Sequence, residues 1–244
     1  MSIAQNIARI RERIAAAAAR AGRNPSEIAL MAVSKTMSAD RIREAFEAGQ
    51  RLFGENRVQE FQAKHAELSA ASPTVASAAV CNVFDIERSE FHLIGHLQSN
   101  KAAKAVELFH SVDSVDSLRL AERLDAAAAK LGKILRVLVE VNVGGEQEKS
   151  GLAPESPELL EILRSGPRLR NLEFRGLMTI PPFTEDPEGA RPYFRRLREL
   201  RDRLSAEIGI PLSELSMGMS HDFEIAIEEG STCVRVGTAI FGER

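Results

Sequence analysis

Eight short apolar segments rich in β-prone residues recur along this chain of 244 residues, and helical patterns lie between most of them. The predicted strands are 28–34, 51–54, 91–95, 110–113, 135–142, 174–178, 214–217 and 232–236. The predicted helices are 39–48, 58–68, 101–108, 117–131, 158–164, 187–208 and 222–229. Strands that alternate with helices run parallel, and eight such units in about 250 residues favour closure into a barrel.

The predicted fold class is therefore α/β, a single (β/α)8 TIM barrel that occupies residues 1–244. An extra helix is expected before the first strand, because Ile3, Ile7, Ile10 and Ile14 recur at helical spacing. An open, doubly wound sheet is the structural alternative. It is less favoured because the chain contains neither GxGxxG nor GxxxxGK[ST], the two nucleotide-binding signatures.

The opening helix is also rich in arginine, which is typical of a mitochondrial presequence. Glu12 interrupts that pattern, and no cleavable linker separates the helix from the next element. No apolar run approaches the roughly 18–20 residues that a spanning helix requires. We therefore expect a cytoplasmic protein without a membrane partner. Cys81 and Cys233, the two cysteines, are expected to be reduced thiols.

The net charge of −3 argues against a general electrostatic grip on phosphate backbones, so no nucleic-acid partner is expected. Residues 70–90 contain Ser-Pro and several alanines without a clear period. This composition predicts a surface loop before the third strand and not a domain boundary.

Lys35 directly follows the first predicted strand, at the end of a barrel where active sites lie. Low dielectric at the end of a buried strand disfavours the charged ammonium and makes the neutral, nucleophilic amine accessible. Lys35 is therefore a candidate for Schiff-base formation. The alternative is a lysine whose ammonium reaches solvent from the strand end.

Two turns with the chemistry of a phosphate site follow the last two predicted strands, at 216–220 and 235–238. Their small residues allow close backbone approach, and their hydroxyls donate hydrogen bonds. Barrels often bind phosphate in the loops after strands seven and eight. Ordinary turn and cap chemistry is the alternative for each turn alone. Together with Lys35, the two turns favour a phosphorylated carbonyl cofactor.

Other residue combinations are weaker. His92 and His96 are four apart like a helical metal pair, but they flank a strand and lack the acidic HExxH context. The run 220–222 has the letters of a hydrolase triad, yet adjacent residues cannot align nucleophile, base and orienting acid. The stretch 191–207, rich in arginine and glutamate, is most simply a solvated helix face.

Taken together, seven segments of the sequence resemble the pyridoxal phosphate homeostasis proteins. They are 32–35 (AVSK), 53–56 (FGEN), 92–95 (HLIG), 97–101 (LQSNK), 175–178 (RGLM), 215–220 (LSMGMS) and 234–238 (VRVGT). The resemblance covers nearly the whole chain. It implies a barrel of the alanine-racemase type, known as PLP fold type III, and pyridoxal 5′-phosphate (PLP) as the cofactor.

The same resemblance implies a role for each candidate site residue. Lys35 corresponds to the Schiff-base lysine, and Asn56 is expected near Lys35 and the cofactor ring. The phosphate cradle corresponds to Ser216, Ser220, Gly237 and Thr238. Arg235 would face the pyridine nitrogen. Because a guanidinium does not give up its proton, it would keep that nitrogen unprotonated and weaken the ring as an electron sink.

The sequence departs from the family pattern at three places. Many members carry a second lysine two positions after the Schiff-base residue, where this chain has Met37. A handover role assigned to that lysine is therefore in doubt for this chain. His221 replaces an acidic or small residue, and the 70–90 excursion is longer than usual.

The resemblance implies a binding protein that holds PLP on Lys35 and delivers it to apo PLP-dependent enzymes, without substantial catalysis. An amino-acid racemase is the alternative, and it needs acid–base groups on both faces of the cofactor. In alanine racemase the second base is a tyrosine from an additional domain and a partner subunit, whereas Tyr193 here lies on a charged helix. A barrel without cofactor is the third reading. A monomer is expected because no second domain is present to build the racemase-type dimer.

Overall fold

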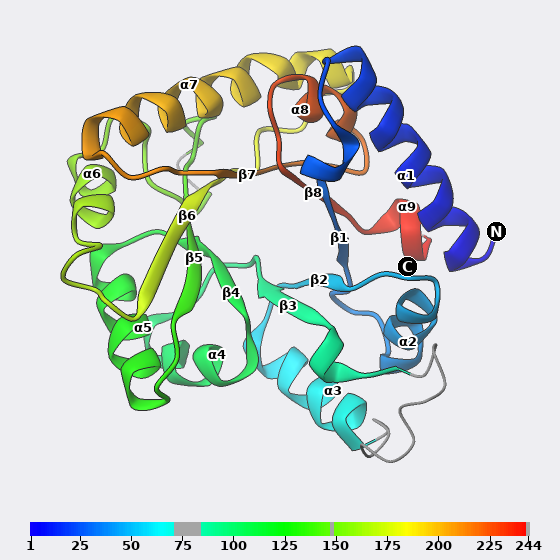
Figure 1. The fold of residues 1–244 in the computed structure, drawn as a ribbon, viewed down its shortest axis with the longest axis horizontal. Coiled ribbons are helices and arrows are strands. Elements are labelled where there is room, and N and C mark those ends of the chain that lie inside the picture. Colours follow the sequence, from blue (N-terminus) through cyan, green and yellow to red (C-terminus); the bar gives the residue numbers. More distant parts are fainter. Residues whose placement is uncertain (71–83, 147–148, 243–244) are drawn as a thin grey trace.

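A computed structural model describes residues 1–70, 84–146 and 149–242, which form a closed barrel of eight parallel strands (Figure 1). The strands are β1 (Ala29–Val33), β2 (Leu52–Glu55), β3 (Glu90–Leu93), β4 (Ser111–Val115), β5 (Leu135–Glu140), β6 (Leu172–Met178), β7 (Glu214–Met219) and β8 (Cys233–Val236). Each strand pairs with its neighbours in sequence, and β8 closes the barrel by pairing with β1 from Ala29↔Cys233 to Ala32↔Val236. The predicted barrel is confirmed, and the open-sheet alternative is wrong.

Helices surround the barrel on its outside (Figure 1). They are α1 (Ile3–Arg20), α2 (Ala39–Glu47), α3 (Val58–Ala70), α4 (Ala102–Leu108), α5 (Leu118–Lys130), α6 (Pro157–Arg164), α7 (Arg191–Ile208), α8 (Phe223–Glu228) and α9 (Thr238–Phe241). Helix α7 begins later than predicted, because 187–190 forms a 3-10 turn capped by the Asp186 side chain. The sequence did not predict α9, since four residues are too few to show a helical period.

The N-terminal helix α1 is amphipathic, as its isoleucine spacing predicts. Its four isoleucines are almost completely buried. Ser2 begins the helix with a capping box, in which its hydroxyl accepts from the Gln5 backbone N–H and the Gln5 side chain accepts from the Ser2 backbone N–H. The helix packs against α8 and α9, and the Asn6 amide donates to the Ile240 carbonyl at 2.8 Å. It is therefore an integral part of the barrel's outer layer.

A cluster of phenylalanines fixes α3 against the barrel. Phe61 of α3 lies 4.5 Å from Phe91 and 4.8 Å from Phe109, measured between ring centroids. Phe53 of β2 stacks on Phe91 at 5.3 Å. All four rings are buried, and each removes a large apolar area from water. Because α3 follows β2 directly, this packing also fixes the end of β2 at the carboxyl mouth of the barrel.

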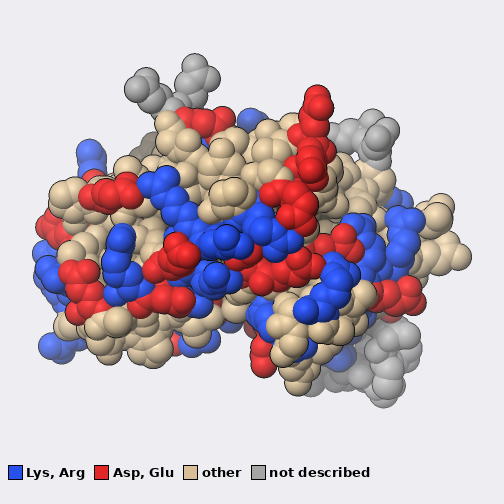
Figure 2. Space-filling model, turned by 90° about the horizontal axis from the view of Figure 1, so that it is seen from above, with Lys and Arg blue, Asp and Glu red and all other residues tan. Residues whose placement is uncertain are grey.

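Acidic and basic side chains intermix on the outer surface. The face seen from above in Figure 2 shows Lys and Arg beside Asp and Glu over the α7 side. Arg191, Arg195 and Arg198 of α7 lie 3.2, 2.9 and 3.0 Å from the buried carboxylate of Glu229. The helix predicted as a simple solvated face therefore also anchors the end of α8.

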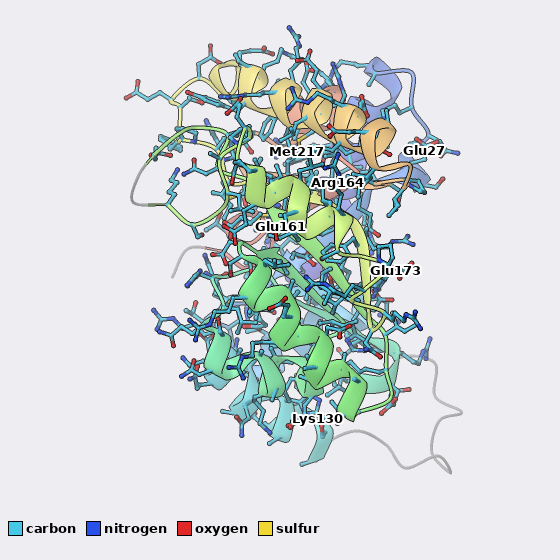
Figure 3. All side chains as sticks on the ribbon, turned by 90° about the vertical axis from the view of Figure 1, so that its left-hand side faces the viewer. Glu27, Lys130, Glu161, Arg164, Glu173 and Met217 are labelled. Atoms are coloured by element: carbon cyan, nitrogen blue, oxygen red, sulfur yellow. The ribbon has the colours of Figure 1, made fainter. Side chains whose placement is uncertain are left out.

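The side of the barrel that carries α5 and α6 also exposes both acidic and basic side chains. Figure 3 looks toward α5 and α6, where Glu161 and Arg164 are exposed. Arg164 reaches Glu207 of α7 at 2.9 Å. Among the described helices, none combines the length and the apolar character that would let it cross a membrane.

Two sequence predictions fall wholly or partly outside the described residues. Cys81 and most of the predicted 70–90 loop lie within 71–83, which the structure does not describe. Its described end, 84–90, contains a 3-10 turn over Ile86–Arg88 that the Asp85 side chain caps. Cys233 is a free, buried thiol, and burial raises its pKa to about 12.

Candidate functional site

A cavity of about 510 Å³ lies at the carboxyl ends of the barrel strands. Six of the seven predicted site residues line it: Lys35, Asn56, Ser220, Arg235, Gly237 and Thr238. These residues follow or end β1, β2, β7 and β8, so residues from both ends of the sequence meet there. The structure therefore brings the predicted site together at the mouth where barrels place their chemistry.

Lys35 lies two residues beyond the end of β1 and is half-buried at the edge of the cavity. The Ser34 N–H continues the parallel pairing by donating to the Gly54 carbonyl at 2.9 Å. The next residue, Thr36, has a φ of 65°, a conformation that β-branched residues rarely adopt. The chain therefore turns sharply at the position that carries the candidate nucleophile.

Arg235 projects from β8 and is 3% exposed. Its Nη1 donates to the Ser216 carbonyl and hydroxyl oxygens at 2.6 and 2.7 Å, and its Nη2 donates to the Thr179 carbonyl at 2.7 Å. Burial lowers the pKa of Arg235, although the carboxylates of Asp113, Asp222 and Glu140 work in the opposite direction. A guanidinium remains protonated in such surroundings, so the cavity contains a fixed positive charge.

Ser216 is not where the phosphate-cradle prediction places it. Its side chain is fully buried, it does not line the cavity, and its hydroxyl accepts a hydrogen bond from Arg235. Ser216 lies inside β7, within the predicted strand 214–217, and β7 continues to Met219, so the turn that follows the strand begins only after Met219. Ser216 supports the guanidinium, and the prediction of a phosphate contact is not supported.

The remaining predicted phosphate ligands do lie together. The Thr238 hydroxyl donates to the Ser220 hydroxyl at 3.2 Å, and Gly237 lines the cavity beside them. The end of β7 before Ser220 depends on Gly218, which has a φ of 93°. A Cβ there would lie 2.5 Å from the Ala226 Cβ. Two neighbouring hydroxyls next to a residue without a side chain form a donor set that fits a phosphate group.

Asn56 reaches the cavity because the ends of β2 and β3 approach each other very closely. A Cβ on Gly95 would lie 2.4 Å from the Asn56 carbonyl oxygen and 2.9 Å from its Cα. Only glycine allows this approach at position 95. Asn56 is half-buried there and faces the same cavity as Lys35.

An acidic wall of the cavity escaped the sequence analysis. Glu140, the last residue of β5, is 5% exposed, and one of its oxygens accepts from the Ser150 hydroxyl at 3.0 Å. Burial raises the pKa of Glu140. His96 also lines the cavity and lies 3.0 Å from Asp116, whose pKa burial likewise raises. The sequence signal was the carboxylate of Glu140 at the end of an apolar run. It was overlooked because the predicted strand 135–142 extends two residues beyond the true end of β5.

The weaker sequence combinations separate in space. His92 contacts Asp113 at 3.0 Å inside the barrel, whereas His96 contacts Asp116 at the cavity. In the 220–222 run, His221 Nε2 lies 3.1 Å from the carbonyl oxygens of Thr184 and Glu185. Asp222 accepts from the Met219 N–H at 2.7 Å. His92 and His96 therefore do not form a metal pair, and residues 220–222 do not form a hydrolase triad.

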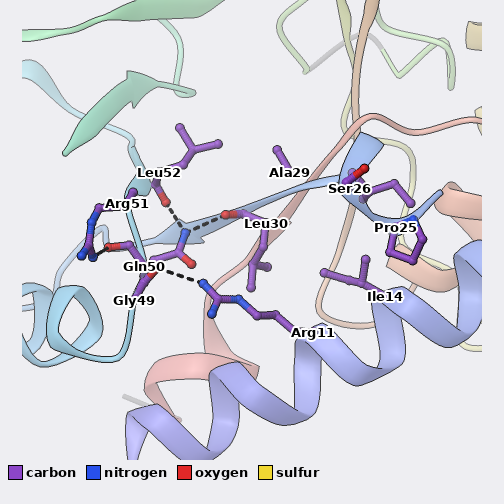
Figure 4. Close-up of a pocket in the computed structure, with 11 residues that line it drawn as sticks. Arg11, Ile14, Pro25, Ser26, Ala29, Leu30, Gly49, Gln50, Arg51 and Leu52 are labelled. Carbon is purple, nitrogen blue, oxygen red and sulfur yellow. Dashed lines mark hydrogen bonds between the residues drawn. The ribbon is translucent and has the colours of Figure 1, made fainter. Parts of the chain in front are cut away.

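A second cavity, of about 470 Å³, lies at the opposite end of β1 and β2, beneath α1. Figure 4 shows the Gln50 amide between the Leu30 and Leu52 carbonyls, to which it donates at 2.6 and 2.7 Å. Arg11 of α1 donates to the Gly49 carbonyl at 3.0 Å. None of the seven predicted site residues lines this cavity, and its polar groups join the strands to α1.

Comparison with known proteins gives matches over the full chain. The family model for the N-terminal domain of alanine racemase matches residues 5–244. A pyridoxal phosphate homeostasis protein of Aquifex aeolicus is 44% identical, over 100% of this chain and 99% of that protein. The protein of the same description from Escherichia coli K12 is 42% identical, over 99% of this chain and 97% of that protein.

Solved structures agree with the sequence matches. PipY of Synechococcus elongatus, a structure with PLP bound, is 38% identical with a TM-score of 0.80, and the match covers 99% of this chain and 100% of PipY. An alanine racemase of Clostridium difficile is 15% identical with a TM-score of 0.66, and the match covers 57% of that chain. The racemase match shows the shared barrel alone.

Proposed function

Because this chain belongs to the pyridoxal phosphate homeostasis protein family, we propose that it binds PLP as a Schiff base on Lys35. In this role it takes part in the intracellular homeostasis and delivery of PLP. The observation that carries the proposal is the single cavity in which Lys35, Arg235 and the Ser220–Thr238 hydroxyl pair meet. An amine, a fixed cation and a pair of hydroxyl donors match the aldehyde, the pyridine nitrogen and the phosphate of this cofactor.

Each residue has a distinct task in this proposal. The Lys35 amine would hold PLP through its aldehyde, for which PLP supplies the electrophilic carbon and the condensation would release water. Ser220 and Thr238 would donate hydrogen bonds to the phosphate, and Gly237 would leave room for it beside them. Asn56 lies along the cavity wall near the ring. These four residues orient the group toward the amine.

Arg235 supports a role in PLP binding and argues against catalysis of an amino-acid reaction. Its guanidinium stays charged and would face the pyridine nitrogen, so that nitrogen would receive no proton from Arg235. An unprotonated ring is a weak electron sink. The racemase alternative also needs a base on the second face of the cofactor. Tyr193 lies on α7 and is absent from the residues that line the cavity. We therefore infer no substantial catalysis.

The proposal includes a cytoplasmic location, a monomeric protein and delivery of PLP to apo PLP-dependent enzymes. Residues 1–244 are proposed to form one PLP-binding domain.

Absorbance and borohydride trapping test the proposal. The protein loaded with PLP is expected to absorb at about 420 nm, as a lysine–pyridoxal imine does. Borohydride should reduce that band to a stable adduct on Lys35. Lys35→Ala should lose both the band and the adduct. Lys130→Ala, which removes an exposed lysine at the end of α5, should retain both.

Two results would contradict the proposal. A wild-type protein that stays colourless with added cofactor would reject PLP binding, and an unchanged adduct in Lys35→Ala would reject the assigned lysine. The racemase alternative has its own test. Exchange of deuterium from solvent into the α-carbon of an amino acid, with steady turnover, would favour it.

A further inference from the structure

The backbone is held on both sides of Lys35 by one helix. The Ser34 carbonyl belongs to the peptide group before Lys35, and it accepts from Lys64 Nζ at 2.8 Å. The Thr36 N–H belongs to the peptide group after Lys35, and it donates to Glu60 Oε1 at 2.5 Å. Glu60 and Lys64 lie one turn apart on α3 and form an ion pair at 2.8 Å. A single ion pair therefore contacts both peptide groups that flank the candidate nucleophile.

A third charged residue completes this arrangement. Glu55 ends β2 and is fully buried, and Lys64 Nζ lies 2.9 and 3.0 Å from its two carboxylate oxygens. The Ser34 hydroxyl also donates to Glu55, at 2.7 Å. An ammonium carries three donors, and Lys64 has three partners: the Ser34 carbonyl, Glu55 and Glu60. Because all three donors of the Lys64 ammonium are paired, the charged group can be buried, and its position is well defined.

The held segment is strained. Thr36 has a φ of 65°, and a β-branched residue adopts this conformation only where its surroundings impose it. The hydrogen bond from its N–H to Glu60 is one such restraint. Release of that bond would let the segment after Lys35 relax toward ordinary backbone angles. The direction of the Lys35 side chain would change with it.

We propose that Glu55, Glu60 and Lys64, here named the α3 clamp, are positioning residues that fix the direction in which Lys35 presents its amine. The inference rests on the proposed function of Lys35. None of the three clamp residues lines the Lys35 cavity, so their effect acts through the backbone at 34–36. Small errors in the placement of a reacting group slow a reaction strongly. By holding the backbone at 34–36, the α3 clamp would therefore affect the rate at which the Lys35 amine reacts.

Two variants separate positioning from simple stabilisation. Glu60→Ala removes the carboxylate that accepts from the Thr36 N–H. The Glu60 side chain is 27% exposed, so the fold is expected to survive its loss. The double variant E55Q/K64M removes the donor of the Ser34 carbonyl without leaving a buried unpaired charge. Glu67→Ala is the matched control, because it removes an exposed carboxylate from the same helix.

The readouts are the rate of imine formation by apo protein with PLP, the affinity for pyridoxamine 5′-phosphate, and the melting temperature. Pyridoxamine 5′-phosphate has no aldehyde, so its affinity reports on the cavity without the reaction of Lys35. Both clamp variants should form the imine at least about tenfold more slowly than wild type. Their affinity for pyridoxamine 5′-phosphate should stay within about threefold, and Glu67→Ala should match wild type in both.

Imine formation within about twofold of the wild-type rate would overturn the inference. A parallel loss of affinity for pyridoxamine 5′-phosphate would also overturn it, because the clamp would then support the whole cavity. If the double variant does not fold, Glu60→Ala decides alone. Failure of the proposed function is distinguishable from failure of the clamp inference, because wild-type protein would then give no borohydride adduct on Lys35.

Discussion

At the scale of single residues, ionisable side chains lie buried inside the barrel. His92 of β3 lies 3.0 Å from the fully buried Asp113, and Asp113 also accepts from the Ser111 hydroxyl. Burial opposes a charge on His92, but Asp113 and Glu90 outweigh it and raise its pKa to about 9. His92 is therefore a cation at neutral pH, as is Arg235 on the same inner surface.

The raised pKa of His92 predicts how stability changes with pH. Protonated His92 stabilises the fold fully below its ordinary pKa of 6.5, and this contribution is lost as pH rises through about 9. The free energy of unfolding in urea should fall by about 1–3 kcal/mol between these two pH values. His92→Gln should lower stability at pH 6.5 and remove most of this dependence. An equal slope in His92→Gln and wild type would contradict the assignment.

The same scale shows why sequence reasoning succeeded at some site residues and failed at others. The position of Lys35 at the cavity was predictable because it directly follows the first apolar strand, at the end of a barrel where sites lie, whereas its role as the Schiff-base lysine stays a prediction from the family resemblance. Ser216 was assigned to the phosphate turn 216–220 although it also lay within the predicted strand 214–217, and in β7 its buried hydroxyl accepts from Arg235. Glu60 and Lys64 went unnoticed because a charged pair four residues apart on a helix is typical of a solvated surface.

At the scale of elements, glycine at strand ends decides how closely neighbouring strands meet. Gly95→Ala should force the ends of β2 and β3 apart, because the new Cβ would lie 2.4 Å from the Asn56 carbonyl oxygen. We expect a loss of about 1–3 kcal/mol in the free energy of unfolding. Weaker binding of pyridoxamine 5′-phosphate should accompany it, since Asn56 moves.

Gly166→Ala is the matched control for this prediction. Its Cβ would find no atom closer than 3.5 Å, and its backbone does not require glycine. Unfolding and ligand binding should both stay near wild type. If Gly95→Ala and Gly166→Ala behave alike in both measurements, close approach of β2 and β3 does not shape the site.

The order of elements was predictable because each strand is a compact apolar run and each longer helix shows its own period. All eight strands and the seven predicted helices occur, with ends that move by a few residues. Helix α9 and the 3-10 turn before α7 were not predictable in this way. Both are a single turn in length, and local hydrogen bonds define them more than apolar spacing does. In the turn before α7, for example, the Asp186 side chain accepts from the Glu188 N–H.

At the scale of the whole molecule, the surface offers charges that are largely paired with one another. The α7 arginines illustrate this, since three of them share Glu229. Sedimentation should therefore give the mass of one chain, 26.7 kDa, with and without bound PLP. A mass that doubles as protein concentration rises would contradict the monomer and direct attention to a racemase-like pairing of barrels.

The closure of β8 on β1 has a consequence for how the protein is made. Lys35 leaves the ribosome well before Arg235, Gly237 and Thr238, because the first of these three lies 200 residues further along the chain. The strand pairing that closes the barrel joins β1 to β8, and the bond from Asn6 to the Ile240 carbonyl joins α1 to α9. A nascent chain therefore contains Lys35 long before β8 closes the barrel beside it. Under the proposed function, the site for the aldehyde is complete only after β8 and the Gly237–Thr238 segment have been made.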